Sequence, residues 1–309
     1  MCDELLLAID TGGSKSDFLL LDPEKHYLDR SRSKGVGALH PGTLPVERYL
    51  RDGLKELGPL TSRVKLVFCS LGGPNVDEVT SALKTLLPEA EILVKREADG
   101  DMILSAAAAC HAKAAVLCGT GSVAVGESRG VRLFSGGWGP LLGDGGSGGG
   151  IGYDALRLLL RSVDSGQGES VLPGVFPNLS RRGGTFAERA SLKTAANRIS
   201  RAEMAAQVPR IAELAEAGDS NAVGLLKKAA EEVAFLAKTV TAETPEADAD
   251  GVLALGGLFD CGELFRELCR RELKKERENY HFVFGAMKII DAAADFAVKI
   301  YKNQRMDIK

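Results

Sequence analysis

The chain has 309 residues, of which 45% are hydrophobic and 26% charged, so it can bury a full core and its length suggests about two domains. Its net charge of -3 excludes a broad basic field that would gather nucleic acid or anionic lipid, so any phosphate that it binds has to be held locally. No apolar run reaches membrane-spanning length and no basic leader precedes the first one, so we expect a cytoplasmic protein without a membrane partner. Six scattered cysteines and four histidines argue against a zinc or iron-sulfur site.

The first third of the chain alternates short apolar runs with amphipathic segments, which is typical of an α/β domain. Strands are expected at 5–9, 18–21, 27–31, 64–70 and 91–95, and helices at 46–57, 76–87 and 101–112. The first two strands flank a glycine turn, which predicts a hairpin.

A second glycine hairpin follows, with strands expected at 114–118 and 123–125 and a further strand at 131–134. Two hairpins of one design indicate a duplicated domain. After an irregular loop at 165–177, apolar residues recur at three- and four-residue spacing, which predicts helices at 201–206, 209–217 and 221–243. A strand at 251–255 and helices at 263–275 and 286–302 complete the chain.

The two hairpin turns carry the groups that phosphate binding requires. Glycines let backbone amides approach phosphate oxygens, and neighbouring hydroxyl groups add donors. The candidate ATP- and phosphate-binding residues are Gly12, Gly13, Ser14, Lys15, Ser16, Gly119, Thr120, Gly121 and Ser122. Lys15 either assists a phosphate or points to solvent, and Asp10, at the end of a buried strand, is placed to hold hydrated Mg²⁺.

A third glycine element strengthens the case for a nucleotide. Gly256, Gly257 and Leu258 follow an apolar strand and precede a helix. Glycines at such a point let a base or ribose lie against the backbone.

These motifs together resemble those of actin-like kinases, in particular the N-acetylglucosamine kinases and the BadF/BadG/BcrA/BcrD ATPase group. Residues 10–16 look like the first phosphate motif, residues 119–122 like the second, residues 255–257 like the adenosine motif and residues 136–144 like the segment beside the sugar. The resemblance implies two ribonuclease-H-like domains with a cleft between them, ATP and Mg²⁺ as cofactors, and a homodimer. We expect a first domain at 1–112, joined by a C-terminal helix at 290–309, and a second at 113–289 with a helical insert.

Kinases of this group use an aspartate at the start of the helix before the second phosphate turn to accept the proton of the sugar hydroxyl. Asp99 and Asp101 are the candidates here. We favour Asp101, because the small residues of the expected helix follow it directly, while one of the two aspartates caps that helix in the simpler interpretation.

The same resemblance indicates substrate contacts at His40, Gly73, Trp138 and Asp144. Gly73 is equally explained as an ordinary strand-ending turn, and Trp138 as a core residue beneath the glycine loop. Two positions depart from the group: Gly145 stands where a glutamate usually follows the aspartate, and His40 stands where asparagine is usual. Both departures bear on which sugar is accepted.

The sequence therefore predicts an ATP-dependent kinase of a small-molecule sugar such as N-acetylglucosamine or glucosamine. One alternative is an ATPase activator of a dehydratase or reductase, whose members share an iron-sulfur cluster; Cys110 and Cys118 lie in the corresponding region, but in different local sequences. The other is a nucleotide or sugar sensor without catalysis.

Overall fold

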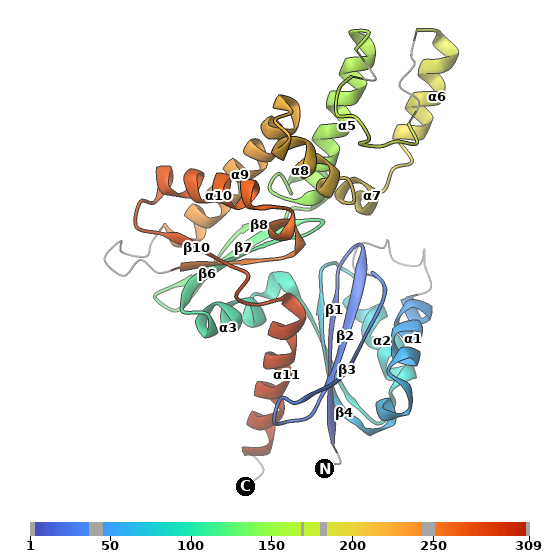
Figure 1. Ribbon diagram of the computed structural model, residues 1–309. Coiled ribbons are helices and arrows are strands. Elements are labelled where there is room, and N and C mark those ends of the chain that lie inside the picture. Colours follow the sequence, from blue (N-terminus) through green and yellow to red (C-terminus); the bar gives the residue numbers. More distant parts are fainter. Residues whose placement is uncertain (1–3, 37–45, 168–169, 180–183, 243–250, 307–309) are drawn as a thin grey trace. The chain divides into compact units, whose positions relative to one another are not determined.

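The computed structural model describes residues 4–36, 46–167, 170–179, 184–242 and 251–306. The chain folds as two units, Met1–Cys110 with Met287–Lys309 and His111–Ala286 (Figure 1). Each unit has its own mixed sheet, and each is described by itself.

The sheet of the first unit has five strands in the order β3-β2-β1-β4-β5. The central strand β1 (Leu5–Thr11) pairs antiparallel with β2 (Lys15–Leu21), which pairs antiparallel with β3 (Tyr27–Lys34). On its other side β1 pairs in parallel with β4 (Val64–Leu71), which pairs in parallel with β5 (Glu91–Arg96). All seven residues of β1 are buried, as expected of a strand covered on both faces.

Helices cover both faces of this sheet. α1 (Val46–Glu56) and α2 (Val76–Leu86) lie on one face, and α11 (Ile289–Met306) packs on β1 and β4 from the other (Figure 1). α3 (Asp101–Ala109) packs against α11. Because side chains alternate along a strand, Ile9 joins the core beneath α1 and α2, so its neighbour Asp10 points to the opposite face.

The second unit repeats this strand order as β8-β7-β6-β9-β10. β6 (Ala112–Cys118), β7 (Ser122–Ser128) and β8 (Val131–Gly136) form the antiparallel part, and β9 (Gly251–Leu255) and β10 (His281–Phe284) the parallel part. One topology used twice confirms the expected duplication of an α/β domain.

The second unit carries the helical segment that the sequence predicted. α9 (Ser220–Thr241) packs across β6, β7 and β8, and α10 (Glu263–Glu276) packs against α9. α8 (Val208–Glu216) begins with Pro209 in its first turn, and Asp219 caps α9 by accepting a hydrogen bond from the amide of Ala222. α5 (Gly148–Asp164), α7 (Arg201–Ala205) and the short α4 (Gly139–Leu142) complete this part.

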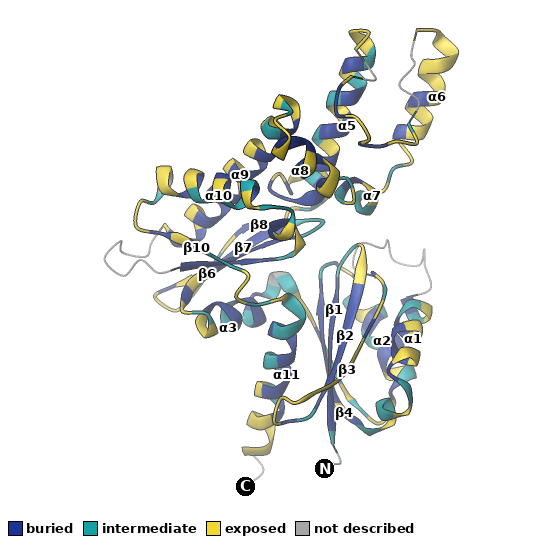
Figure 2. Ribbon diagram, viewed as in Figure 1, coloured by how far each residue is buried: buried dark blue, intermediate teal, exposed yellow. Residues whose placement is uncertain are grey.

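Several elements differ from the sequence-based expectation, among them α4 and α5, for which no bounds were predicted. The expected helix 101–112 ends at Ala109, because His111 has a φ of 54° and β6 begins at Ala112. α6 (Phe186–Ala196) and β10 were not predicted. α6 is exposed over most of its length (Figure 2) and buries only Leu192 and Ala196, so its apolar periodicity is weak.

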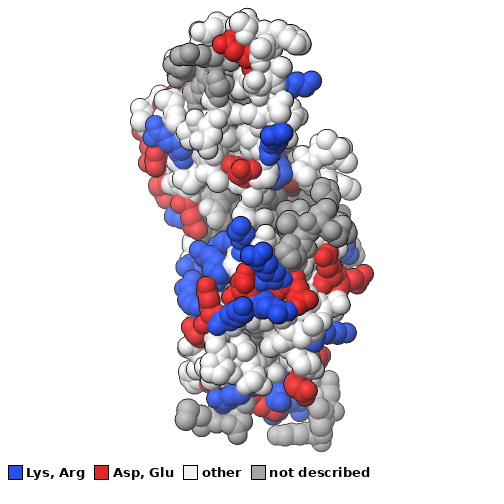
Figure 3. Space-filling view, turned by 90° about the vertical axis from the view of Figure 1, so that its right-hand side faces the viewer, with Lys and Arg blue, Asp and Glu red and all other residues white. Residues whose placement is uncertain are grey.

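Charge is mixed on the surface that Figure 3 shows, where lysine and arginine side chains alternate with aspartate and glutamate side chains. No helix among the described residues is both long enough and apolar enough to cross a bilayer.

Candidate functional site

The first glycine turn joins β1 to β2. The amide of Gly12 donates to the carbonyl of Lys15 at 3.0 Å and closes the turn. Gly35, just after β3, lies directly over it: a Cβ on Gly35 would come within 2.3 Å of the Gly12 oxygen. Because C=O and N–H point in opposite directions across a trans peptide, the amide of Gly13 points away from Gly35.

The hydroxyl of Ser16, a predicted phosphate donor, belongs to the interior of this hairpin. Ser16 is fully buried and its Oγ donates to the carbonyl of Lys34 at 3.1 Å. The Oγ atoms of Thr11 and Ser16 are 2.5 Å apart, and Thr11 Oγ1 accepts from the amide of Val36 at 3.2 Å. With its donor used on Lys34, the Ser16 hydroxyl braces the turn, whereas Ser14 is exposed on it.

Lys15 faces a carboxylate. Its Nζ lies 2.9 Å from Oδ2 of Asp17, whose Oδ1 accepts from Nε of Arg32 at 2.6 Å. Burial opposes ionisation of Asp17, but the hydrogen bonds and charges of Lys15 and Arg32 outweigh it and lower the pKa of this carboxyl. The Lys15 side chain is also 55% exposed, and its role toward a phosphate stays a prediction.

Asp10 forms a hydrogen-bonded carboxyl pair with Glu97, a residue that the sequence did not single out. Burial, followed by the charge of Asp17, raises the pKa of Asp10 from 3.8 to about 7. Burial and the charge of Asp10 raise the pKa of Glu97 well above its usual range. Two carboxyl groups can hydrogen-bond to each other only if one is protonated, so the pair retains a proton near neutral pH.

The surroundings of this pair suit a hydrated divalent cation. Asp10 is 9% exposed, and its Oδ1 has no hydrogen-bond partner among the described residues. Oγ of Ser70 on β4 also has no hydrogen-bond partner among the described residues. Ser70 pairs in register with Asp10, so the two side chains point to the same face of the sheet. Oxygen donors, with one or two carboxylates and several waters, are what Mg²⁺ requires. Among the described residues of the first unit, Asp10 and Glu97 therefore fit this ion.

The two base candidates lie on consecutive elements. Asp99 ends the short helix η2 (Glu97–Asp99), where its Oδ2 accepts from the amide of Arg96 at 3.2 Å and its Oδ1 lies 3.6 Å from Nε of Arg96. Asp101 is the first residue of α3, after Gly100 with a φ of 80°. The carboxylate of Asp99 is thus used in capping, and Asp101 stands in the first turn of the longer helix.

The loop after β4 lies beside these residues. The amide of Gly72 donates to the carbonyl of Thr11 at 2.9 Å, and a Cβ on Gly72 would lie 3.1 Å from Oε2 of Glu97. Gly73, a predicted sugar contact, follows and is partly exposed. His40 lies outside the described residues.

In the second unit, the turn between β6 and β7 is oriented by the start of α5. The amides of Gly148 and Gly149 donate to the carbonyls of Gly119 and Thr120 at 2.8 and 3.2 Å. Both carbonyls therefore point toward α5, and the amides of Thr120 and Gly121, at the other side of the same peptide planes, point away from it. Two adjacent amides directed one way are an arrangement that suits an anion, and phosphate binding at this turn stays a prediction.

Asp144 braces the same turn. It is 7% exposed with a φ of 64°; its Oδ1 accepts from the amide of Ser122 at 3.0 Å, and its Oδ2 lies 3.3 Å from Nη2 of Arg201. Nη2 of Arg201 also lies 3.5 Å from the carbonyl of Thr120. Arg201 was not anticipated, because nothing in the local sequence links the start of α7 to a turn 81 residues earlier.

Trp138 does not fill the core. It is 74% exposed, and Leu141 and Leu142 after it are also exposed. The interpretation that this tryptophan packs beneath the glycine loop is therefore wrong.

The third glycine element begins with a close backbone approach. Gly256 has a φ of 102°, and a Cβ there would lie 2.2 Å from the carbonyl oxygen of Cys118 on β6. Gly257 and Leu258 open the short helix η4 (Gly257–Asp260), and a Cβ on Gly257 would meet no atom within 4 Å. Gly256 thus serves the packing of β9 on β6, whereas Gly257 leaves open space beside the backbone.

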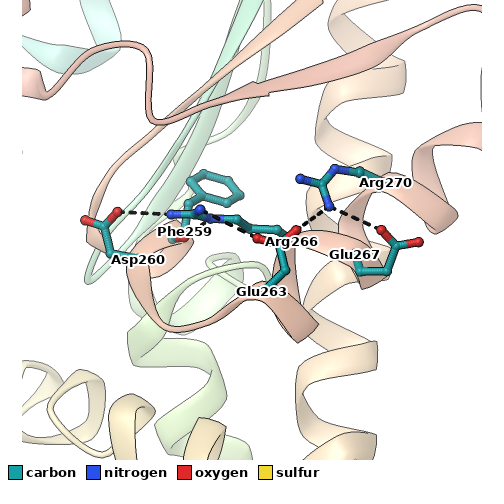
Figure 4. A network of polar contacts seen from close by, with 6 residues as sticks. All are labelled: Phe259, Asp260, Glu263, Arg266, Glu267 and Arg270. Carbon is teal, nitrogen blue, oxygen red and sulfur yellow. Dashed lines mark hydrogen bonds and ion pairs between the residues drawn. The ribbon is translucent and has the colours of Figure 1, made fainter. Parts of the chain in front are cut away.

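An arginine network holds η4 on α10 (Figure 4). Nε of Arg266 donates to the carbonyl of Phe259 at 2.7 Å, and its guanidinium lies within 4 Å of Asp260 and Glu263 at 3.6 and 3.7 Å. Arg270 continues the network to Glu263 at 2.6 Å and to Glu267 at 3.2 Å. The network stabilises the backbone that follows the glycine pair.

The family model for the BadF/BadG/BcrA/BcrD ATPase family matches residues 7–284. The chain belongs to this family. An N-acetyl-D-glucosamine kinase of Dictyostelium discoideum is 31% identical in an alignment of 183 positions that covers 53% of this chain and 56% of that protein. An N-acetylmuramic acid/N-acetylglucosamine kinase of Clostridium acetobutylicum is 27% identical over 55% of this chain and 58% of that protein. The chain thus spans somewhat more than half the length of these curated relatives.

The structure of a candidate N-acetylglucosamine kinase from Chromobacterium violaceum superposes with a TM-score of 0.67 and 19% identity, over 94% of this chain and 97% of that one. At this identity the likeness shows the fold. Together with the two five-stranded sheets, it confirms the expected fold class of two actin-like ATPase domains in this member of the BadF/BadG/BcrA/BcrD family.

Proposed function

We propose that this BadF/BadG/BcrA/BcrD family member is an ATP-dependent kinase of an amino sugar, with N-acetylglucosamine, glucosamine or a close relative as acceptor. Family membership and the two kinase relatives support this class of activity. The observation that carries the proposal is the orientation of the turn 119–122 by the first amides of α5, because it directs adjacent backbone donors to one side, as a polyphosphate requires.

The residues divide the work of phosphoryl transfer. The amides of the turn 119–122 and of Gly13 bind phosphate oxygens, and the open backbone at Gly257 accommodates the adenosine. Asp10, supported by Glu97, would hold Mg²⁺, and the ion would neutralise charge on the phosphates. Asp101 accepts the proton of the sugar hydroxyl. The oxygen of that hydroxyl attacks the terminal phosphorus of ATP, and the bond between this phosphorus and the oxygen that leaves with ADP breaks.

Measurement of ADP release with a panel of amino sugars, hexoses and polyols tests the proposal. We expect release that depends on both Mg²⁺ and an amino sugar, and a phosphorylated sugar by mass spectrometry. Absence of ADP release with every acceptor, together with absence of magnesium-dependent ATP uptake in calorimetry, would reject a kinase. ATP uptake without turnover would instead favour the non-catalytic sensor.

The activator alternative requires cysteines that can hold iron. Cys118 is fully buried, and burial raises the pKa of its thiol far above the usual range, which disfavours the thiolate that binds iron. Iron analysis of anaerobically purified protein decides the matter: we expect a colourless protein, and a stoichiometric cluster would support the activator. The homodimer that the family resemblance implies is tested by light scattering.

A further inference from the structure

A glutamate of α9 occupies the space beside Gly145. A Cβ on Gly145 would lie 2.9 Å from both Cγ and Cδ of Glu232 and 3.1 Å from its Oε2. Contacts below 3.0 Å between non-bonded carbons are not tolerated, so a side chain at 145 and the observed position of Glu232 exclude each other. The carboxylate therefore reaches the loop 143–147 from α9 at the place where the loop itself has only a hydrogen.

The next residue of the loop, Gly146, also packs against α9. A Cβ on Gly146 would lie 2.9 Å from Cγ2 of Val233 and 3.1 Å from its backbone nitrogen. Two consecutive glycines thus let the loop backbone contact α9 at Glu232 and Val233.

A cavity of about 330 Å³ opens at this point within the second unit. Its lining includes Ser122, Phe134, Trp138, Asp144, Glu232 and Phe235. This volume is at the lower end of the range for small-molecule sites, which suits a monosaccharide better than a larger ligand. Ser122 and Asp144 also belong to the second phosphate turn and its brace, so the cavity adjoins the proposed nucleotide site.

The lining combines the two chemistries that a sugar ring needs. Trp138 is 74% exposed, and Phe134 and Phe235 are exposed by about half at 47% and 57%, so apolar ring faces are available to the C–H face of a pyranose. Glu232 makes no hydrogen bond or ion pair with any residue that the structure describes, whereas its neighbour Glu231 lies 3.8 Å from Lys227. An ionised carboxylate accepts hydrogen bonds from hydroxyl groups.

We propose that Glu232 is a substrate-binding residue that determines specificity, accepting hydrogen bonds from hydroxyl groups of a sugar seated against Trp138. The inference rests on the proposed kinase function and adds to it the carboxylate that Gly145 lacks. Glu232 replaces, from a helix distant in sequence, a group that the loop does not provide.

The chain contains one tryptophan, so intrinsic tryptophan fluorescence reports on Trp138 alone. Titration of the protein without nucleotide with glucosamine, N-acetylglucosamine and glucose should give a saturable change with at least one sugar. Glu232→Gln should weaken that binding by about ten- to a hundredfold, the loss expected for a hydrogen bond to a charged group. Glu231→Gln, the matched control on the same helix, should bind as the wild type does.

A swap of the two positions tests the geometry. Glu232→Ala should weaken binding, and Gly145→Glu added to Glu232→Ala should restore part of it, because the new side chain enters the vacated space. A double variant that binds no better than Glu232→Ala would overturn the claim that both positions serve one place. Equal melting temperatures of wild type and Glu232→Gln exclude a folding defect.

The outcomes separate the two proposals. Glu232→Gln with unchanged sugar affinity and unchanged KM, in a protein that phosphorylates a sugar, overturns the role of Glu232 and leaves the kinase assignment intact. No sugar response and no ADP release in the wild type overturn both.

Discussion

The contact of the buried Asp10 with the half-buried Glu97 is more informative than either residue alone. In the sequence, Asp10 is an aspartate at the end of an expected strand, a position compatible with structural, metal-binding or catalytic roles. Burial and the charge of Asp17 raise its pKa and make its ionisation unfavourable, so in the absence of a cation this carboxyl costs stability when charged.

We predict a pH dependence of stability from this residue. The pKa of Asp10 rises on folding from 3.8 to about 7, so the folded state binds the proton more tightly than the unfolded state. Its contribution to stability is fully present below about pH 4 and is lost as the pH rises through about 7, with a slope of at most about 1.4 kcal/mol per pH unit. Urea unfolding of wild type and Asp10→Asn in metal-free buffer from pH 5 to pH 8 measures the difference.

Asp10→Asn should become progressively more stable relative to wild type across that range. Asp29→Asn, at an exposed position on β3, is the control and should leave the slope unchanged. A constant difference between wild type and Asp10→Asn over the whole range would contradict the raised pKa.

The choice of catalytic base is a second prediction at this scale. Asp101→Asn should lower kcat by about 10²- to 10⁴-fold, the usual contribution of a general base, and leave the Kd for ATP nearly unchanged. Steady-state kinetics and calorimetry measure the two quantities.

Asp99→Asn is the matched control for that experiment. It should cost about 0.5–2 kcal/mol of stability, because it weakens the cap on the amide of Arg96, and should retain turnover. The reverse pattern, loss of turnover in Asp99→Asn alone, would assign the base to Asp99.

At the scale of elements, the decisive pairing is that of α5 with the turn 119–122. The first amides of α5 are satisfied by the carbonyls of this turn, so the helix start serves to orient another backbone. Ser147 completes the arrangement as the cap of α5, accepting from the amide of Gly150 at 3.0 Å. The glycines at the start of α5 are needed because the two backbones lie in contact.

Gly149→Ala tests this pairing. The new Cβ would lie 2.5 Å from the carbonyl oxygen of Thr120 and 2.6 Å from Cζ of Arg201, so it should displace α5 from the turn. We expect the affinity for ATP to fall by at least about tenfold, the equivalent of one charge-assisted hydrogen bond, as measured by calorimetry.

Gly224→Ala is the comparison within the same unit. A Cβ on Gly224 in α9 would meet no atom within 4 Å, so this change should raise stability by about 0.5–1 kcal/mol and leave ATP binding unchanged. If Gly149→Ala also left the affinity for ATP unchanged, the claim that α5 orients the turn 119–122 would be wrong.

At the scale of the whole molecule, the first unit is discontinuous and the second is not. α11 returns from the far end of the chain to cover β1 and β4, with Phe296 at 5.0 Å from Phe68 between ring centroids. Tyr301 and Arg305 on the same helix contact the carboxylate of Glu4. The first unit therefore depends on the last residues of the chain for one face of its core.

Truncation after Ala286 should unfold the first unit and spare the second. Removal of α11 exposes the apolar face of β1 and β4, whereas residues 111–286 retain their own continuous core. Limited proteolysis should leave a resistant fragment close to 111–286, with loss of helical and strand signal in circular dichroism. Cooperative loss of both units would contradict separate cores.

Local sequence accounts for much of what was foreseen. The alternating apolar runs and glycine turns of the hairpins place their strands within a few residues, and Pro209 and Asp219 mark helix starts as their chemistry dictates. α6 could also have been found, since Thr185 and Glu188 form a capping box at its start. β10 could not, because four residues with one buried phenylalanine carry too little pattern.

The sequence by itself determined the duplicated α/β fold and the glycine turns, because hydrophobic periodicity and turn composition are properties of neighbouring residues. Only the tertiary structure decided that Glu97 pairs with Asp10, that Arg201 braces the turn of Thr120, and that Glu232 takes the space of a side chain at 145. These contacts join residues that are 81 to 87 positions apart in the chain, and such distances become contacts only when sheets and helices pack. The glycine turns indicate where a phosphate can bind; the packing around them decides which side chains are placed to use it.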